Sequence, residues 1–178
     1  ILTTGKWQGE IWNTKKNSEE YVERLLIDTV FNSQNEVLYR IGMFTDITAK
    51  KQAEEKVWLQ ANFDQLTGLP NRHMFSDRLN QDIKLSKRST KPLALLFIDL
   101  DHFKEVNDSL GHEMGDLLLT DAAQRIHRCI RSSDTVARIG GDEFTVVLAE
   151  LESTQDVERI AQAIIENLVR VFNLGVEE

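Results

Sequence analysis

The amino-acid sequence predicts an α+β fold, a palm-like antiparallel sheet with flanking helices, preceded by a small β-meander and a connecting helix. Three segments have apolar residues at helical spacing: residues 72–83, 115–131 and 153–171. Three others are continuous apolar runs, which are typical of strands: residues 93–98, 135–139 and 144–148. Their order is helix, strand, helix, strand–turn–strand and helix. This order fits helices packed on an antiparallel sheet.

The composition restricts the functions that the chain can have. Its 178 residues, 41% of them hydrophobic, suffice for one large domain or two small ones. A net charge of -8 argues against a general surface for nucleic acids or anionic membranes. We expect no membrane segment, since no apolar run reaches about 18 residues. Cys129 is the single cysteine, and the absence of disulfides fits a cytoplasmic protein.

The first third of the chain predicts three antiparallel strands, at residues 7–12, 21–31 and 37–45, with polar turns between them. Three such strands cannot bury a core alone, so we expect their packing partners upstream or in another chain. Trp7 and Trp12 either line a ligand pocket or belong to ordinary core.

Residues 49–62 predict a helix rich in Lys, Glu, Gln and Ala, without Gly or Pro. Ala53 and Val57 form a thin apolar seam on it. This helix is either a linker that pairs in a dimer or a solvated connector.

A carboxylate follows the first apolar run of the larger region. Residues 93–98 predict a buried central strand that ends at Asp99. A carboxylate at the end of a rigid strand is well placed to hold a metal ion. Residues 99–101 resemble the start of a calcium-binding loop. However, Phe103 occupies the third ligand position and no Gly follows, which excludes an EF-hand.

Residues suited to a nucleotide come next. Residues 102–104 begin a short helix whose free N–H groups, together with Lys104, are expected to cradle phosphate oxygens. Asn107, His112 and Asp116 follow on either side of a glycine. Amide and carboxylate groups together offer the donors and acceptors that match a guanine edge, although Asn107 alone would be an ordinary turn residue.

A second acidic feature is the stretch Gly-Gly-Asp-Glu at residues 140–143, between two apolar runs. Paired glycines between strands predict a tight hairpin, with Asp142 and Glu143 at its tip. Alone, these acids would be a solvated turn. If Asp99 ends a neighbouring strand, the three carboxylates converge on a metal site for nucleotidyl transfer.

Residues 64–72 form a turn-rich boundary before this region. Asn71 is expected to cap the helix that follows it. We expect Asp64 and Arg72 to form a structural ion pair that clamps the turn.

Four ordered motifs, at residues 64–72, 97–108, 111–116 and 140–144, resemble those of the GGDEF family of diguanylate cyclases. The resemblance covers residues 63–178 and implies a GGDEF domain that is incomplete at its C-terminus. We therefore expect a part of a longer protein.

Residues 1–48 resemble the last three strands of a PAS sensor domain, most specifically in the Asp-Ile-Thr at residues 46–48. Residues 49–62 would then be a linker helix between sensor and GGDEF domains. The ligand of such a sensor is not readable from these strands.

The family resemblance implies an activity: a homodimer condenses two GTP molecules into cyclic di-GMP and releases two pyrophosphates. It also implies a role for individual residues. The implied ligands of Mg²⁺ or Mn²⁺ are Asp99, the Leu100 carbonyl, Asp142 and Glu143, and the implied catalytic groups are Asp142 as the base, Glu143 and Lys104. The implied substrate-binding residues are His102, Phe103, Asn107, His112 and Asp116.

Arg131 and Asp134 match the inhibitory site at which the family binds its product. Without the resemblance, Arg131 would be a cation at a helix C-terminus and Asp134 a turn residue. The resemblance implies feedback inhibition by cyclic di-GMP.

Two other functions stay open. The chain could be a catalytically silent domain that binds GTP or cyclic di-GMP, possibly controlling a downstream EAL phosphodiesterase domain. It could instead be a structural dimerisation platform, which would leave the acids unexplained. Turnover of GTP distinguishes the diguanylate cyclase from the silent receptor domain. Any binding of a nucleotide excludes the structural platform.

Overall fold

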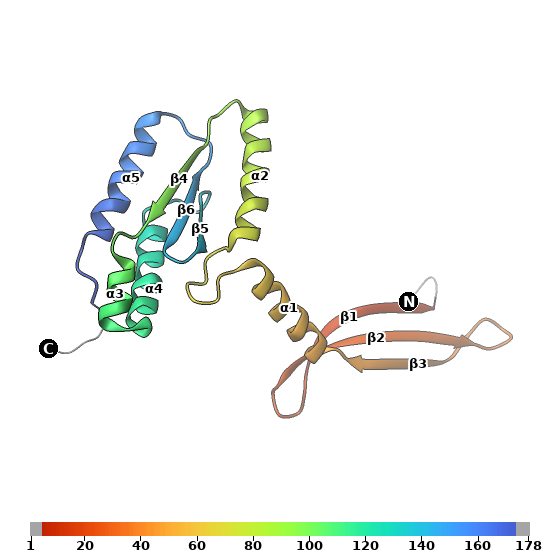
Figure 1. The fold of residues 1–178 in the computed structure, drawn as a ribbon. Helices are drawn as coiled ribbons and strands as arrows, with labels where there is room; N and C mark the ends of the chain where they lie inside the picture. Colours follow the sequence, from red (N-terminus) through yellow and green to blue (C-terminus); the bar gives the residue numbers. More distant parts are fainter. Residues whose placement is uncertain (1–4, 174–178) are drawn as a thin grey trace. The chain divides into compact units, whose positions relative to one another are not determined.

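The computed structural model describes residues 5–173 and divides the chain into two compact units, residues 1–58 and 59–178 (Figure 1). Each unit has its own three-stranded sheet. Among the described residues, no helix combines the length and the apolar character needed to cross a bilayer.

The first unit is the predicted meander. Its strands are β1 (Lys6–Thr14), β2 (Glu20–Phe31) and β3 (Val37–Asp46), paired antiparallel in that order. Helix α1 (Thr48–Asn62) begins in this unit, and Asp46 Oδ1 accepts a hydrogen bond from the Thr48 N–H at 2.9 Å. The three strands and this helix confirm the secondary structure predicted for residues 7–62.

Little of this sheet is buried, as expected for three strands. All ten residues of β3 are exposed, and α1 has no buried residue. Trp7 lies across Gly9, where a Cβ would come within 2.7 Å of the indole ring. Trp12 is 72% exposed, so it is not core.

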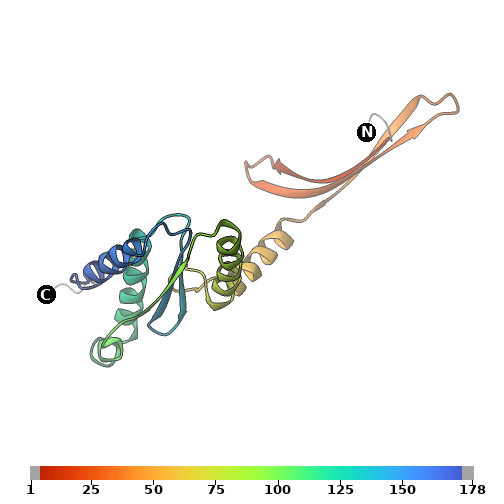
Figure 2. The ribbon, with the colours of Figure 1, turned by 90° about the horizontal axis from the view of Figure 1, so that it is seen from above.

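The second unit is an antiparallel sheet between two helical layers (Figures 1 and 2). Its elements are α2 (Arg72–Ser89), β4 (Ala94–Asp99), α3 (Phe103–Leu110), α4 (His112–Arg128), β5 (Thr135–Gly140), β6 (Glu143–Leu148) and α5 (Thr154–Leu168). The strand order is β4-β6-β5. Figure 2 shows α2 on one face of the sheet and α4 with α5 on the other. The predicted α+β architecture with flanking helices is confirmed.

Alternate residues of β6 supply the two cores. Phe144, Val146 and Leu148 pack with Leu119, Ile126 and other residues of α4 and α5. Val147 packs with Phe75 of α2 on the opposite face. All four β6 side chains are 0% exposed. Burial on both faces makes β6 the rigid centre of the sheet.

The prediction of a central strand at residues 93–98 is wrong. Within the described residues β4 lies at the edge of the sheet and pairs only with β6, and Phe97 is 79% exposed. A continuous apolar run indicates contact with apolar neighbours on both faces, but it carries no information about the position of the strand in the sheet.

The last helix is shorter than predicted. Helix α5 ends at Leu168, and Val171 is 90% exposed instead of facing inward. Arg125 of α4 redirects the chain there, because its guanidinium donates to the carbonyls of Asn167 at 2.9 Å, Arg170 at 2.7 Å and Val171 at 2.9 Å. A cation beside these carbonyls also complements the negative C-terminal end of the helix dipole.

Asn71 begins α2 and also holds the end of α1. Its Oδ1 accepts from the His73 and Met74 N–H groups at 3.0 and 3.1 Å, which confirms the predicted cap. Its Nδ2 donates to the Ala61 carbonyl at 2.9 Å. One side chain therefore joins two helices across the intervening turn.

We predict that Asn71→Ala lowers the free energy of unfolding by about 1–2 kcal/mol, the usual cost of losing an N-cap. Asn71→Asp keeps the acceptor and should recover most of this loss. Urea denaturation of the three proteins provides the measurement. Equal losses in the Ala and Asp variants would show that the bond to Ala61, not the cap, carries the stability.

Candidate active site

Two carboxylates face each other at one end of the sheet. Asp99 is the last residue of β4 and Glu143 the first of β6, and the antiparallel register pairs them directly. Residues opposed in this way have Cβ atoms about 4.5–5.5 Å apart. Both side chains are exposed, whereas Asp142, in the turn before β6, is half-buried. The prediction that Asp99 and Glu143 meet across neighbouring strands is confirmed.

Two glycines make this arrangement possible. Gly140 and Gly141 have φ values of 154° and 55°, a region that a Cβ disfavours. They turn the chain so tightly that Gly140 of β5 already pairs with Glu143 of β6. Asp142 therefore lies in the turn and Glu143 directly after it, at the predicted tip of the hairpin.

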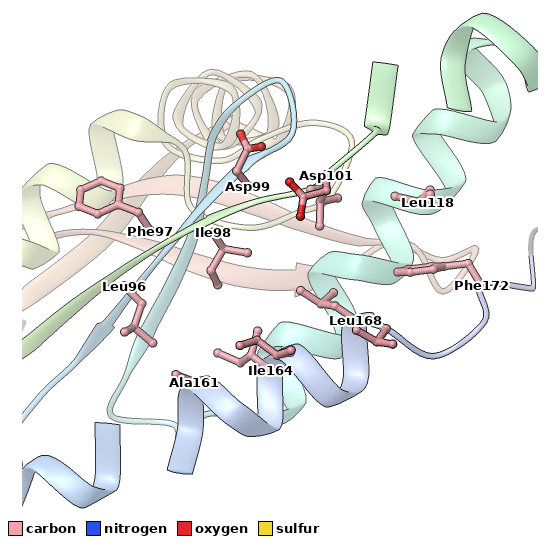
Figure 3. Close-up of a pocket in the computed structure, with 13 residues that line it drawn as sticks. Leu96, Phe97, Ile98, Asp99, Asp101, Leu118, Ala161, Ile164, Leu168 and Phe172 are labelled. Carbon is pink, nitrogen blue, oxygen red and sulfur yellow. The ribbon is translucent and has the colours of Figure 1, made fainter. Parts of the chain in front are cut away.

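Two cavities adjoin the carboxylates. Asp99, Glu143 and Arg72 line a cavity of about 310 Å³. A second cavity of about 460 Å³ has Asp99 and Asp101 at its polar end, and apolar side chains of β4, α4, α5 and the segment after α5 line most of the rest (Figure 3).

The donor set suits a hard cation. Asp99 and Glu143 offer carboxylate oxygens and Leu100 a carbonyl oxygen, the ligands that Mg²⁺ takes in proteins. Among residues 5–173, however, no group of three or more His, Cys, Asp or Glu side chains is close enough together to hold a metal. Asp142 thus does not complete a preformed three-carboxylate cluster.

The start of α3 differs from the expected phosphate cradle. His102 adopts φ 61° and provides no side-chain cap. The Phe103 N–H donates to the Leu100 carbonyl at 3.2 Å, so it is not free as predicted. A hydrogen bond with Glu105, at 2.8 Å from Nδ1 to Oε1, raises the pKa of His102 above its usual value. Lys104 is exposed on the first turn of α3.

The predicted base-reading residues lie on two neighbouring helices. Asn107 is half-buried on α3, and its amide group lies against Gly115 of α4. Asp116 follows Gly115 and is exposed, as is His112 at the start of α4. The structure therefore brings Asn107 beside the helical turn that carries Asp116.

Arg138 joins the hairpin turn to the turn at residues 64–71. Its Nη1 donates to Asp64 Oδ1 and Oδ2 at 3.0 and 3.1 Å. Its Nε and Nη2 donate to the Gly141 carbonyl at 2.9 and 2.7 Å. The predicted Asp64–Arg72 pair is therefore wrong, because the cation paired with Asp64 is Arg138.

Sequence reasoning missed Arg138. It stands in a strand whose neighbours Val136 and Ala137 are buried, and its own side chain is only 12% exposed. An arginine in such a strand must find an acidic partner when it is buried, and this was the available signal. The identity of the partner, 74 positions away, was not readable.

The environment keeps Asp64 ionised. Burial alone would raise its pKa, but hydrogen bonds from the Thr67 hydroxyl and N–H, at 2.6 and 2.9 Å, and from Arg138 outweigh that effect and lower the pKa. The pair therefore carries both charges at neutral pH.

Arg131 and Asp134 lie in the turn between α4 and β5. Asp134 accepts hydrogen bonds from the N–H groups of Arg131 at 3.0 Å and Ala149 at 3.2 Å. The Arg131 side chain is exposed and forms no ion pair with any described residue. Asp134 is thus a turn residue, whatever else it binds.

We predict that Asp64→Asn and Arg138→Met each lower the free energy of unfolding by about 2 kcal/mol, the scale of hydrogen bonds to charged groups. The exposed Asp108→Asn serves as a control and should change little. Because the pKa of Asp64 is lowered from 3.8, its contribution is complete above that pH and disappears as the pH falls through the lowered pKa.

Denaturation between pH 7 and pH 2 tests this expectation. The stability difference between the unmodified protein and Asp64→Asn should stay constant down to about pH 4 and shrink below it. A difference that grows on acidification would contradict the charged pair.

The comparisons with known proteins agree on one family. The family model for the diguanylate cyclase GGDEF domain matches residues 61–178 of this sequence. The diguanylate cyclase TpbB of Pseudomonas aeruginosa is 50% identical over 116 residues, which are 65% of this chain and 27% of TpbB. The cyclic di-GMP phosphodiesterase NbdA of the same species is 44% identical over 168 residues, which are 94% of this chain and 19% of NbdA. The chain thus spans about a quarter or less of these relatives.

A solved structure supports the same conclusion. The coiled coil and GGDEF domain of DgcB from Caulobacter crescentus, in complex with c-di-GMP, gives a TM-score of 0.61 at 30% identity. The match covers 66% of this chain and 61% of that chain. The paired carboxylates, the double-glycine hairpin and the matched residues 61–178 lead to one conclusion: the chain belongs to the family of diguanylate cyclase GGDEF domains.

Proposed function

We propose that the protein is a diguanylate cyclase that converts two GTP into cyclic di-GMP and two pyrophosphates. In each half-reaction a 3′-hydroxyl oxygen bonds to the α-phosphorus of the other GTP, the bond from that phosphorus to the bridging oxygen breaks, and pyrophosphate leaves. The hydroxyl proton passes to a base. The observation that carries this proposal is the opposition of Asp99 and Glu143 at one end of the sheet.

Opposed carboxylates repel each other unless a cation lies between them. Asp99, Glu143 and the Leu100 carbonyl offer oxygen ligands for Mg²⁺ or Mn²⁺, and Asp142 is near enough in sequence to join them. A bound ion would neutralise the charge that develops on the attacked α-phosphate and the departing pyrophosphate. Asp142 takes the proton of the hydroxyl, and Glu143 also helps to fix the geometry.

The remaining residues bind the substrate. Lys104, exposed on the first turn of α3, offsets negative charge on the phosphates. Asn107 and Asp116 recognise the guanine base, because an amide donates to O6 and a carboxylate accepts from the N2 amino group. His112 contacts the nucleotide, and His102 and Phe103 line the phosphate end.

Association and an upstream signal control the reaction. Each protomer of a homodimer holds one GTP, and the positioning of the two supplies much of the rate. The exposed apolar side chains of α1 support a linker helix that pairs in this dimer. Residues 1–48 are the end of a PAS sensor domain, residues 49–62 the linker, and residues 63–178 the GGDEF domain, with all of these acting in the cytoplasm.

Product inhibition involves Arg131 and Asp134. The exposed Arg131 guanidinium is suited to bind a phosphate or a guanine edge of cyclic di-GMP. Asp134 already accepts two backbone hydrogen bonds, so Arg131 contributes more of the binding.

A second candidate function is a silent GTP or cyclic di-GMP receptor that regulates a phosphodiesterase domain. The observation in its favour is the likeness to NbdA, which is named a phosphodiesterase and aligns with 94% of this chain. Both functions need the same nucleotide site, so turnover distinguishes them.

We predict that Asp142→Asn lowers cyclic di-GMP synthesis by at least about a hundredfold, because a positioned base contributes this much to proton transfer. The natural-length protein is incubated with GTP and Mg²⁺, and the product is measured by chromatography. The exposed Glu158→Gln on α5 removes a charge elsewhere and should retain the unmodified rate. Undiminished synthesis by Asp142→Asn would overturn the site assignment, and bound GTP without any product would support the receptor function.

We predict that Arg131→Ala raises the cyclic di-GMP concentration needed for half-maximal inhibition about tenfold or more, the equivalent of one charge-assisted hydrogen bond. Initial rates of pyrophosphate release at increasing cyclic di-GMP give the measurement. An unchanged inhibition curve would place the inhibitory site elsewhere.

A further inference from the structure

The contact between α3 and α4 has an unusual feature at Gly115. A Cβ built on this buried glycine would overlap Asn107 Oδ1 and lie 3.0 Å from Asn107 Cγ. The next nearest atom is Phe103 Cζ, at 3.3 Å. The amide of Asn107 therefore occupies the space that any side chain at position 115 would need.

No hydrogen bond holds this amide in place. Within residues 5–173, the Asn107 side chain makes no hydrogen bond, while its backbone carbonyl accepts from the Gly111 N–H at 2.9 Å. The amide is half-buried, so its donor and acceptor groups are open to a ligand. Because Gly115 has no Cβ, the amide can occupy this space, and close packing there restricts its orientation.

Gly115 also precedes Asp116 directly. Gly115 sets the position of the Asn107 amide, and the next residue, Asp116, carries the carboxylate. The distance between the amide and the carboxylate therefore depends on the absence of a side chain at position 115. Guanine presents an O6 acceptor and an N2 amino donor, whereas adenine presents an amino donor at N6. A pair consisting of an amide and a carboxylate distinguishes these edges only if both groups are held in register.

We propose that Gly115 is a specificity-determining positioning residue that holds Asn107 beside Asp116 for recognition of guanine. This inference rests on the proposed function, in which Asn107 and Asp116 bind the base. Gly115 does not touch the nucleotide. It acts through the orientation of the Asn107 amide.

The contacts of Gly115 indicate that Gly115→Ala should affect the orientation of Asn107 without destabilising the fold. An Ala methyl at position 115 displaces the end of a flexible side chain, and Phe103 needs to shift only slightly. Neither helix backbone has to move, and Ala has a higher helix propensity than Gly. The cost of Gly115→Ala therefore falls on the orientation of Asn107 and not on stability.

The test measures the binding of GTP and of ATP by calorimetry, using the natural-length protein with Mg²⁺. The variants compared are Gly115→Ala, Asn107→Ala and the double variant, with the exposed Gln124→Ala on the same helix as the control. We expect Gly115→Ala to weaken GTP binding about tenfold or more, on the scale of one base-edge contact, with ATP binding nearly unchanged. Its melting temperature should equal or exceed that of the unmodified protein. The double variant should bind GTP no more weakly than Asn107→Ala, since both changes remove the same contact.

Three outcomes would overturn the inference. GTP binding by Gly115→Ala within twofold of the unmodified protein, while Asn107→Ala loses affinity, would refute the positioning role and leave the proposed function intact. Equal losses for GTP and ATP would indicate general damage to the site. Unchanged discrimination in Asn107→Ala would refute the guanine assignment itself, and the inference with it.

Discussion

The guanidinium of Arg138 is the contact on which the acidic end of the second unit depends. It binds both oxygens of Asp64 and, twice, the carbonyl of Gly141, and the Arg138 N–H also donates to the Pro70 carbonyl at 3.1 Å. Gly141 immediately precedes the acids, so the turn that carries them is tied to the turn that follows α1. Because the guanidinium is nearly buried, loss of either partner would leave a charge without compensation, which is costly in a protein interior.

The sheet supplies the rigidity that this clamp needs. Glu143 is exposed, but the residues that follow it in β6 are buried on both faces of the sheet, between α2 and the layer of α4 and α5. Asp99 likewise follows Ile98, which packs against the main core. Apolar packing thus holds the backbones of Asp99 and Glu143 opposite each other, while both carboxylates are exposed to solvent. A cation bound between the two carboxylates would reduce their mutual repulsion, which is the physical basis for the proposed metal.

The sequence was most informative where local chemistry decides the structure. The paired glycines predicted the hairpin, Asn71 predicted the start of α2, and helical spacing predicted the helices of the second unit. It was least informative about tertiary pairing. The apolar run before Asp99 could not reveal an edge position, the partner of Asp64 lies 74 residues away, and the end of α5 is set by Arg125 on another helix. These features depend on which elements meet in space, and periodicity within one segment does not encode that.

Four of the proposed functional groups are adjacent, in the chain or in space, to a residue that packing fixes. Asp99 follows Ile98, Glu143 precedes Phe144, and Asn107 lies against Gly115, which itself precedes Asp116. Apolar burial therefore positions these polar residues, together with the polar clamp that Arg138 forms at the hairpin turn. It follows that a substitution at a buried or glycine position can change the proposed chemistry without touching a nucleotide. Such effects should be largest where the displaced group is flexible, since there the fold survives and only the orientation of the functional group is lost.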